Sequence, residues 1–504
     1  MRWLLRIALL LGGLFVAGFF ACGLLPERWA VNAPIWNSLF GWGAEPPAAE
    51  AFGTRIRAAG GYAVSLYATV PKARFLRPTP AGDLLGTVPR EGRVVRLARD
   101  ADGDGRPDAQ ETLLEGLDRP HGIDLHEGWL YLGEGSAVAR VRFDAATGRV
   151  VGEPEHIVTG LPEGGNHWTR TVRIGPDGYL YVTVGSSCNV CREEDERRAA
   201  MLRFRLDGSE GEIWARGLRN SVGFDWRPAT GELFATDNGR DLLGDDFPPC
   251  ELNRIVRGGD YGWPVANGDR ELDPDQGAGQ EARAAASIPP AHGFRAHTAP
   301  LGITFLESDA HPEPYRGAAL VALHGSWNRT RKDGYAVVSL HWGPDGSIRE
   351  EDFLVGFLSD EDVIGRPVDV AEAADGTIFV SDDYAGAVYR VTREAGRARS
   401  NSASAPALAA AATGDPLAEL EPARRAASAA RGETHWHALE CASCHVPEQA
   451  APGVVPVPLR ELGRRHDLAG LTAFLAAPTP PMPAVALAER ERADLAVYLL
   501  ERFR

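Results

Sequence analysis

A repeated pattern of turn residues and short apolar runs extends from about residue 51 to residue 393. Each copy starts with a glycine- or proline-containing turn, continues as a β-rich apolar run and closes with a second turn. The six copies are AGDLLGTV (81–88), HEGWLYLGEG (126–135), PDGYLYVTVG (176–185), TGELFATDNG (230–239), RGAALVALHG (316–325) and ADGTIFVSDD (374–383). Short strands at recurring spacing, without helical periodicity, indicate an all-β repeat. We predict a six-bladed β-propeller over residues 51–393, because about 340 residues disfavour the alternative, a β-sandwich.

The hydrophobic pattern changes after the last repeat. Residues 394–424 are rich in alanine and serine and predict a linker. Residues 425–504 contain three stretches in which apolar positions recur with a helical period, as in LRELGRRHDLAGLTAFLAA. The sequence thus predicts a second, small all-α domain over residues 425–504.

An apolar run at the N-terminus predicts export. Arg2 and Arg6 precede the uncharged stretch Ile7–Leu25, whose 19 residues are enough to cross a bilayer as a helix. Basic residues before such a helix stay in the cytoplasm, so the remainder would be periplasmic. We assign residues 1–30 to a transmembrane anchor and 31–50 to a spacer. A cleaved signal peptide is the alternative, and Cys22 leaves a lipoprotein cleavage site open.

Composition excludes one class of partner. The formal net charge is −16 and no long Lys/Arg run is present. Nucleic acid requires cationic partners for its phosphates, so nucleic-acid binding is not expected. The helical domain instead contains Cys441-Ala-Ser-Cys444-His445.

The CxxCH sequence predicts covalent attachment of haem c. Cys441 and Cys444 would add to the vinyl groups, and His445 would bind the iron from one side. Met482, the single methionine of this domain, lies in the proline-rich loop APTPPMPAV and is the expected sixth ligand; His466 is the alternative. We therefore predict a cytochrome c domain, in which a Met/His ligand pair favours electron transfer.

Three stretches of the repeat region carry more specific information. They are GGNHWTRTVRIGPDG (164–178), ARGLRNSVGFDW (215–226) and TDNGRDLLGDDFPPCELNRIVRGGDYGWP (236–264). On these motifs, residues 55–395 resemble the soluble quinoprotein glucose dehydrogenases and their sorbosone and pyranose relatives. That family implies a six-bladed propeller that binds pyrroloquinoline quinone (PQQ) and Ca²⁺.

The resemblance implies roles for individual residues. His167 matches the catalytic base, and imidazole suits proton abstraction near neutral pH. Arg219 and Asn220 match the quinone-binding pair, in which an arginine fork suits a quinone carboxylate. Arg366 matches a further quinone contact, whereas Val368 stands where the family has a second arginine. Asn328 replaces a lysine of the glucose enzymes, and Arg329 or His324 could supply the missing contact. Gly239 and Arg240 match backbone carbonyls that hold calcium, and Cys250 stands where an acid is expected.

A second calcium site is predicted from spacing alone. The loop DADGDGRPDAQE follows the ligand spacing of an EF-hand loop, although Pro107 and the strand-like flanks depart from that motif. The expected ligands are Asp100, Asp102, Asp104, Asp108 and Glu111. An acidic surface turn is the alternative.

The second CxxC, in GSSCNVCREE (185–194), has no histidine after it and so does not indicate haem. A zinc site would need two further ligands, and a thioredoxin-like site would need a βαβ unit. We favour a disulfide between Cys188 and Cys191 that walls the quinone pocket, with Cys250 free; pairing of Cys250 with either cysteine remains open.

Together these features predict a membrane-anchored periplasmic dehydrogenase. A sugar, or a sugar-derived aldehyde or alcohol, would reduce PQQ, and the tethered haem would pass electrons to a respiratory acceptor. The alternatives are a propeller hydrolase or lactonase, and a non-catalytic docking propeller, each fused to a cytochrome.

Overall fold

The computed structural model contains two compact units, residues 1–396 and 397–504, and each is described by itself. The structure describes residues 30–32, 45–394, 417, 420–439, 441–446, 449, 459, 462, 467–476, 482 and 487–503. Residues 1–29 of the predicted membrane anchor lie outside these residues. Within them, no helix is both long enough and apolar enough to cross a bilayer.

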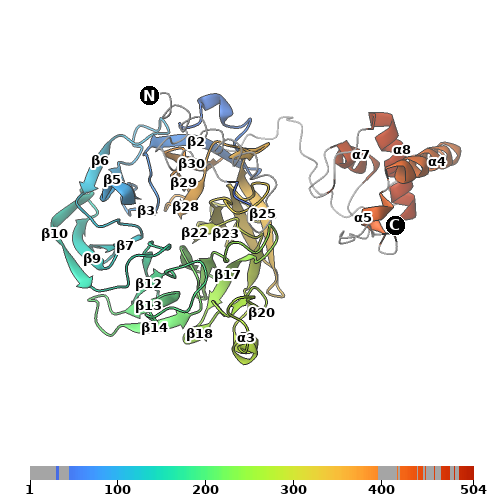
Figure 1. Cartoon of the computed structure of the whole chain (residues 1–504). Coiled ribbons are helices and arrows are strands. Elements are labelled where there is room, and N and C mark those ends of the chain that lie inside the picture. The colour runs from blue at the N-terminus through green and yellow to red at the C-terminus, as the bar shows by residue number, and fades with distance from the viewer. Residues whose placement is uncertain are drawn as a thin grey trace, which may run out of the picture. The chain divides into compact units, whose positions relative to one another are not determined.

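The first unit is a six-bladed β-propeller, as predicted (Figure 1). The blades, written from their first strand outward, are β3 (Leu76–Pro78), β4 (Leu84–Val88), β5 (Arg93–Leu97), β6 (Gln110–Leu114); β7 (Ile123–His126), β8 (Trp129–Gly133), β9 (Val138–Asp144), β10 (Arg149–Val158); β11 (Val172–Ile174), β12 (Leu180–Val184), β13 (Ala200–Phe204), β14 (Glu212–Arg216), β18 (Gly259–Asp260); β15 (Phe224–Trp226), β16 (Leu233–Asp237), β17 (Cys250–Ile255), β21 (His292–Phe294); β22 (Pro300–Phe305), β23 (Ala319–Leu323), β24 (Ala336–Trp342), β25 (Ile348–Val355), β1 (Arg57–Ala58); and β28 (Pro367–Glu372), β29 (Ile378–Asp382), β30 (Ala387–Arg393), β2 (Tyr62–Thr69).

The six sequence repeats are the second strands of the six blades, β4, β8, β12, β16, β23 and β29. These strands are buried almost throughout, as in the LYVTV of β12 and the LFATD of β16. A strand in the middle of a blade is covered on both faces by the neighbouring blades, so its residues do not alternate between apolar and polar. This is why the repeats appear as continuous apolar runs.

The ring closes by pairing of its two ends. Strand β2, from the beginning of the propeller, is the outermost strand of the last blade and pairs antiparallel with β30. The first strands of neighbouring blades contact one another around the axis. Short additions outside the blades are the hairpins β19 (Ala266–Asn267)–β20 (Glu271–Leu272) and β26 (Leu358–Ser359)–β27 (Asp362–Val363), the helix α3 (Glu281–Ala286), and the 3-10 turns η3 (Ala49–Ala51) and η4 (Pro89–Glu91).

The second unit is helical in its described residues. Its helices are α4 (Pro422–Ala438), α5 (Ala442–His445), α7 (Leu468–Ala476) and α8 (Glu489–Arg502). Helices α4 and α8 pack closely at Gly432, where a Cβ atom would lie 2.1 Å from the carbonyl oxygen of Asp494. The Asp494 carboxylate also accepts hydrogen bonds from Ser428 and Arg431 on α4. This crossing is the framework of the unit.

Candidate active site

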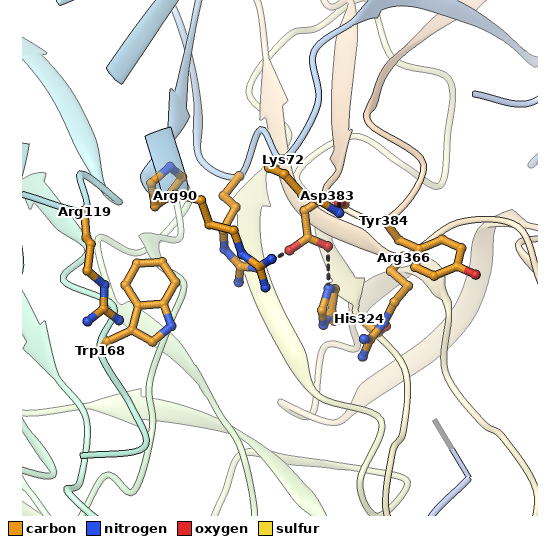
Figure 2. Close-up of a pocket in the computed structure, with 10 residues that line it drawn as sticks. Lys72, Arg90, Arg119, Trp168, His324, Arg366, Asp383 and Tyr384 are labelled. Carbon is orange, nitrogen blue, oxygen red and sulfur yellow. Dashed lines mark hydrogen bonds and ion pairs between the residues drawn. The ribbon is translucent and has the colours of Figure 1, made fainter. Parts of the chain in front are cut away.

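One end of the propeller, called the mouth here, collects the predicted site residues. At the mouth the first strand of each blade begins and its second strand ends, so every blade offers two loops to the same region. Two pockets lie there. The base pocket, of about 320 Å³, is lined by Asn166, His167, Arg219, Asn220, Asn238, Gly239, Asp241, Cys250, His297, Ala299, Leu301 and Trp327. The cationic pocket, of about 700 Å³, is lined by Lys72, Arg74, Pro89, Arg90, Arg119, Trp168, His324, Arg366, Asp383 and Tyr384 (Figure 2).

His167 is held in a defined tautomer at the base pocket. Its Nδ1 lies 2.9 Å from the carbonyl oxygen and 2.8 Å from the hydroxyl oxygen of Ser186. Because the Ser186 hydroxyl donates its proton to the carbonyl of Cys188 at 2.8 Å, both Ser186 oxygens act as acceptors toward the imidazole. Nδ1 therefore carries the hydrogen, and Nε2 keeps a free lone pair. Burial, together with Arg219 and Arg198, lowers the pKa of His167 to about 3, so the ring is neutral at physiological pH.

The loop after β12 leaves no room for a side chain behind His167. A Cβ atom on Gly185 would lie 2.5 Å from Cβ of His167 and 2.8 Å from Oδ1 of Asn220. Glycine at this position is thus required for His167 and Asn220 to lie against the same strand end.

Arg219 and Asn220 lie in the base pocket, but Arg219 does not offer a free fork. Its Nε and Nη2 donate to the backbone and side-chain oxygens of Asn189, and Nη2 also contacts Asp241 at 3.1 Å. Its Nη1 donates to the Asn238 carbonyl at 3.0 Å. Four of the five N–H groups of the Arg219 guanidinium are used in these contacts, so the group can present mainly its flat face to a ligand. Asn220, in contrast, keeps a buried Oδ1 without a hydrogen-bond partner.

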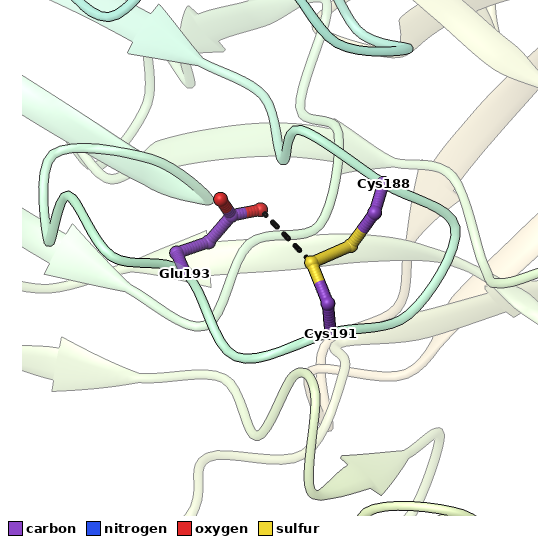
Figure 3. Close-up of side chains that lie close together, drawn as sticks. All are labelled: Cys188, Cys191 and Glu193. Carbon is purple, nitrogen blue, oxygen red and sulfur yellow. Dashed lines mark hydrogen bonds between the residues drawn. A yellow bond between two sulfur atoms is a disulfide. The ribbon is translucent and has the colours of Figure 1, made fainter.

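The prediction of a Cys188–Cys191 disulfide is confirmed, and Cys250 forms no disulfide. Figure 3 shows the bond, with the Glu193 carboxylate beside it. Glu193 accepts hydrogen bonds from the amide and hydroxyl of Ser187. The bonded sulfurs are unavailable as thiolate ligands, which excludes a zinc site. The expectation that the disulfide walls the pocket is wrong, because neither cysteine lines it.

The disulfide loop instead positions two site residues through hydrogen bonds. The Cys188 carbonyl orients Ser186, which fixes His167, while Asn189, inside the loop, binds Arg219. Asn189 also accepts from the amide of Asp241 at 2.8 Å, which joins the loop after β16 to the same network.

Opening this loop is expected to weaken the site without removing a ligand-contacting group. For the double substitution Cys188→Ser/Cys191→Ser we expect about a tenfold rise in the Kd for the quinone that the sequence resemblance implies, similar to other losses of supporting hydrogen bonds. Fluorescence titration of the apo protein with PQQ checks this. The single variants should match the double variant, since all three break the same bond. A folded double variant with the original Kd would contradict this role.

The remaining predicted quinone contacts divide into two groups. Arg366 and His324 line the cationic pocket. Arg366 donates to the carbonyls of His324 and Gly325 and keeps three N–H groups. Burial and Arg366 lower the pKa of His324 to about 4, so its Nε2–H donates to Asp383 at 2.9 Å.

Asn328 and Arg329 line neither pocket. The Asn328 amide is buried and holds the amide of Leu242 and the carbonyl of Ala30. Arg329 donates to the carbonyls of Asp245 and Ala296. These side chains are used in connecting loops, so we do not assign them to the site. Val368 is buried in an apolar cluster.

Gly239 lines the base pocket and, with Arg240, a cavity of about 20 Å³ beneath it. Two buried carboxylates, Asp237 and Glu251, line the same cavity. Burial raises the pKa of Glu251 to about 7, and burial together with Glu251 raises the pKa of Asp237 well above its usual range. A divalent cation here would stabilise both ionised forms, so this oxygen-rich corner fits calcium. Cys250, in the acid's place, stays a thiol because burial raises its pKa to about 11.

The acidic loop at 100–111 brings together three of its five predicted ligands. Oxygens of Asp100, Asp102 and Asp108 lie within 4.8 Å of one another. Asp100 keeps a buried Oδ1 without a hydrogen-bond partner, and its side chain is 8% exposed. Glu111 is outside this group because it lies on β6, paired with Arg96 at 2.6 Å. Asp104 turns toward the amide of Arg106.

In the helical unit, several described residues of the predicted haem site border one apolar cluster. Cys441 and Met482 pack against a cluster that contains Trp436, Leu471 and Leu495. The His445 ring lies 6.2 Å, between centroids, from that of Trp436. The side chain of Cys444 and the whole of His466 lie outside the described residues.

Sequence reasoning missed most of the cationic pocket. Arg74, Arg90, Arg119, Trp168 and Asp383 were not predicted. Each lies at a blade's mouth loop: before β3, after β4, before β7, before β11 and after β29. The signal that could have found them is their position in the repeat, which is equivalent to that of His167, Arg219 and Gly239.

Comparisons with known proteins agree with a dehydrogenase propeller. The family model "Glucose / Sorbosone dehydrogenase" matches residues 130–393, just over half of the chain. An uncharacterized protein of Borreliella burgdorferi is 32% identical over 300 residues, covering 56% of this chain and 78% of its own. The pyrroloquinoline quinone-dependent pyranose dehydrogenase of Coprinopsis cinerea is 26% identical over 371 residues, covering 58% of this chain and 49% of its own.

Solved structures share the fold. The holo PQQ domain of the Coprinopsis cinerea pyranose dehydrogenase has a TM-score of 0.59 and 23% identity, covering 70% of this chain and 99% of that domain. A calcium structure of a Trichoderma reesei family AA12 enzyme has a TM-score of 0.59 and 22% identity, covering 68% and 97%.

The fold and site thus define an oxidoreductase built on a six-bladed propeller. The chain belongs to the glucose/sorbosone dehydrogenase family. It spans about half the length of the Coprinopsis enzyme.

Proposed function

We propose that the propeller is a PQQ- and calcium-dependent dehydrogenase of a sugar or a sugar-derived alcohol or aldehyde. The observation that carries this proposal is His167: a neutral imidazole with a free Nε2 in a pocket that also contains Arg219 and Asn220. Relatives named for PQQ-dependent sugar oxidation support the assignment.

The residues present fit a planar, anionic quinone. Asn220 offers a buried carbonyl oxygen without a partner, Arg219 offers a flat cationic face, and Arg366 offers three free N–H donors to a carboxylate. Gly239 and Arg240, through backbone carbonyls, and Asp237 and Glu251, through carboxylates, would hold the calcium ion. A bound quinone would supply the hydride acceptor for substrate oxidation, and calcium would supply a Lewis acid.

The protein's own contribution is proton transfer and orientation. The Nε2 atom of His167 takes the proton of the substrate hydroxyl as the carbon is oxidised. Ser186 holds the Nδ1–H and so keeps Nε2 in the accepting form.

The direct test is reduction of a dye by purified protein with and without added PQQ and Ca²⁺, screened over aldoses, sorbosone and alcohols. Reduction that requires both additions supports the proposal. Reduction that is the same without PQQ, or is seen with no substrate of these classes, contradicts it.

The pH profile of kcat/KM should show no titration near the usual pKa of histidine. Because the pKa of His167 is lowered to about 3, the imidazole is already neutral well below pH 6.5. We expect kcat/KM of the reconstituted protein to stay level from pH 8 down to about pH 4 with respect to this group. An acid limb centred near 6.5, the usual pKa of histidine, would contradict the environment described for His167.

The Asp100 loop is proposed as a second calcium site that stabilises the propeller. Calcium bound to the folded state alone should raise Tm of the quinone-free protein by about 2–4 °C at saturating concentration. Asp102→Asn/Asp108→Asn should abolish the part of the shift due to this loop. Asp104→Asn, the same chemical change outside the cluster, is the control. Equal shifts in all three proteins would contradict the site.

The C-terminal unit is proposed to be a cytochrome c domain that receives electrons from the propeller. Cys441 and Cys444 would attach the haem, and His445 and Met482 would bind its iron. The supports are the CxxCH sequence and the shared apolar cluster beside Cys441 and Met482. A periplasmic location, attached to the inner membrane by residues 1–30, is proposed from the sequence, with a respiratory carrier as the electron acceptor.

A further inference from the structure

The cationic pocket contains more positive charge than a PQQ site requires. Its lining includes five cationic side chains, Lys72, Arg74, Arg90, Arg119 and Arg366, and a single carboxylate, Asp383. Positive charge would remain even if all three quinone carboxylates lay here. A pocket of about 700 Å³ also has room beyond a quinone's edge.

Two of these arginines have side chains that form neither a hydrogen bond nor an ion pair with another described residue. Arg74 pairs with Asp383, and Lys72 donates to the Asp383 carbonyl at 3.1 Å. Arg366 is fixed by the carbonyls of His324 and Gly325. Among the residues that the structure describes, Arg90 and Arg119 form no ion pair with a carboxylate.

Arg119 is held by the aromatic residue that follows the proposed base in the sequence. Its guanidinium lies 4.5 Å from the ring centroid of Trp168, the residue that directly follows His167. The backbone of Arg119 lies in the left-handed region, with a φ of 51°. Figure 2 shows Arg119 and Trp168 together at one side of the pocket. Arg119 thus links the cationic pocket to the residue that follows the proposed base in the sequence.

We propose that the substrate is an acidic sugar, a uronic acid whose carboxylate is bound by Arg119 and Arg90. Arginine forks suit carboxylates, and two unpaired guanidiniums favour an anion over a neutral hydroxymethyl group. The inference rests on the proposed function. The anomeric carbon gives a hydride, with its two electrons, to the quinone, the anomeric hydroxyl gives its proton to Nε2 of His167, and the product is the lactone.

The test compares D-glucuronate with D-glucose, which differ only at the carbon farthest from the anomeric centre, on protein loaded with PQQ and Ca²⁺. We expect a higher kcat/KM for glucuronate. Arg119→Gln and Arg90→Gln should each lower the ratio of kcat/KM for glucuronate to that for glucose by about 10- to 100-fold, as expected for losing a charge-assisted bond. Arg149→Gln removes the same charge from an exposed strand position, where the side chain is 70% exposed, and should leave the ratio unchanged.

Salt provides an independent readout. KM for glucuronate should rise with ionic strength in the original protein and in Arg149→Gln, and this dependence should weaken in Arg119→Gln. Glucose 6-phosphate, tested in parallel, distinguishes a phosphate from a carboxylate.

Three results would overturn the inference: a ratio near one in the original protein, a preference for the sugar phosphate, or variants that raise the Kd for PQQ while the ratio stays constant. The last result would assign these arginines to the quinone. Absence of quinone-dependent reduction with every sugar would instead reject the proposed function; glucuronate binding to the apo protein, measured by calorimetry, would still test the anion site.

Discussion

Replacing His167 with alanine is expected to lower kcat/KM for the sugar substrate by about 10²–10⁴-fold, the usual contribution of a general base. The expectation follows from the tautomer: Ser186 fixes the hydrogen on Nδ1, so Nε2 is the free proton acceptor at the base pocket. The measurement is steady-state dye reduction by protein reconstituted with PQQ and Ca²⁺.

The His167 result requires controls for folding and for loss of cofactor. The Kd for PQQ, from titration, should stay within a few-fold of the original value, because the ring is proposed to act on the substrate. His126 is a partly buried residue at the end of β7, on the side of its blade away from the mouth. His126→Ala should therefore have the activity of the original protein. Full activity in His167→Ala would exclude the residue as the base, and loss of PQQ binding would assign it a cofactor role instead.

The propeller could be predicted because its signal is repeated six times. Each buried second strand, such as β12 or β29, forms a continuous apolar run between turns, so an error in one copy does not change the count. Strand order, by contrast, was not predictable: the pairing of β2 with β30 joins segments more than 300 residues apart, and nothing local encodes it.

The site was predictable only where a residue type has a narrow role. His167 and the Arg219–Asn220 pair were found by resemblance, and the structure brings them into one pocket. The use of the Arg219 donors was not foreseen, because Asn189 approaches from a loop that the disulfide shapes. Asn328 lies outside both pockets for a similar reason: its amide satisfies two backbone groups of connecting segments, and such a need cannot be seen without coordinates.

The CxxC motifs show the same limit. The histidine after Cys444 separates a haem sequence from the Cys188–Cys191 pair on local grounds alone. What the second pair does depended on its neighbours, since Ser186 and Asn189 transmit its effect to His167 and Arg219. The local sequence thus identified the Cys188–Cys191 disulfide, whereas its role in positioning His167 and Arg219 is visible only in the folded structure.

The second large effect concerns the haem. Cys441→Ser/Cys444→Ser should remove all covalent haem staining, because both thioether bonds are lost. On addition of substrate, the original protein is expected to show reduced-haem absorption, and this signal should be absent from the variant while dye reduction at the propeller continues. This result would separate sugar oxidation from onward electron transfer.

Met482→Ala refines the same experiment. The haem should stay attached through Cys441 and Cys444, but loss of the thioether ligand should lower the reduction potential, since methionine ligation raises it. Met201, buried on β13 of the propeller, is the matched control, and Met201→Leu should leave the potential unchanged.

Staining that persists in the double cysteine variant would reject covalent attachment at this motif. An unchanged potential in Met482→Ala would assign the sixth position to another group, with His466 the first to test. Neither outcome would bear on the proposed chemistry of the propeller, which the activity of the His167→Ala variant tests separately.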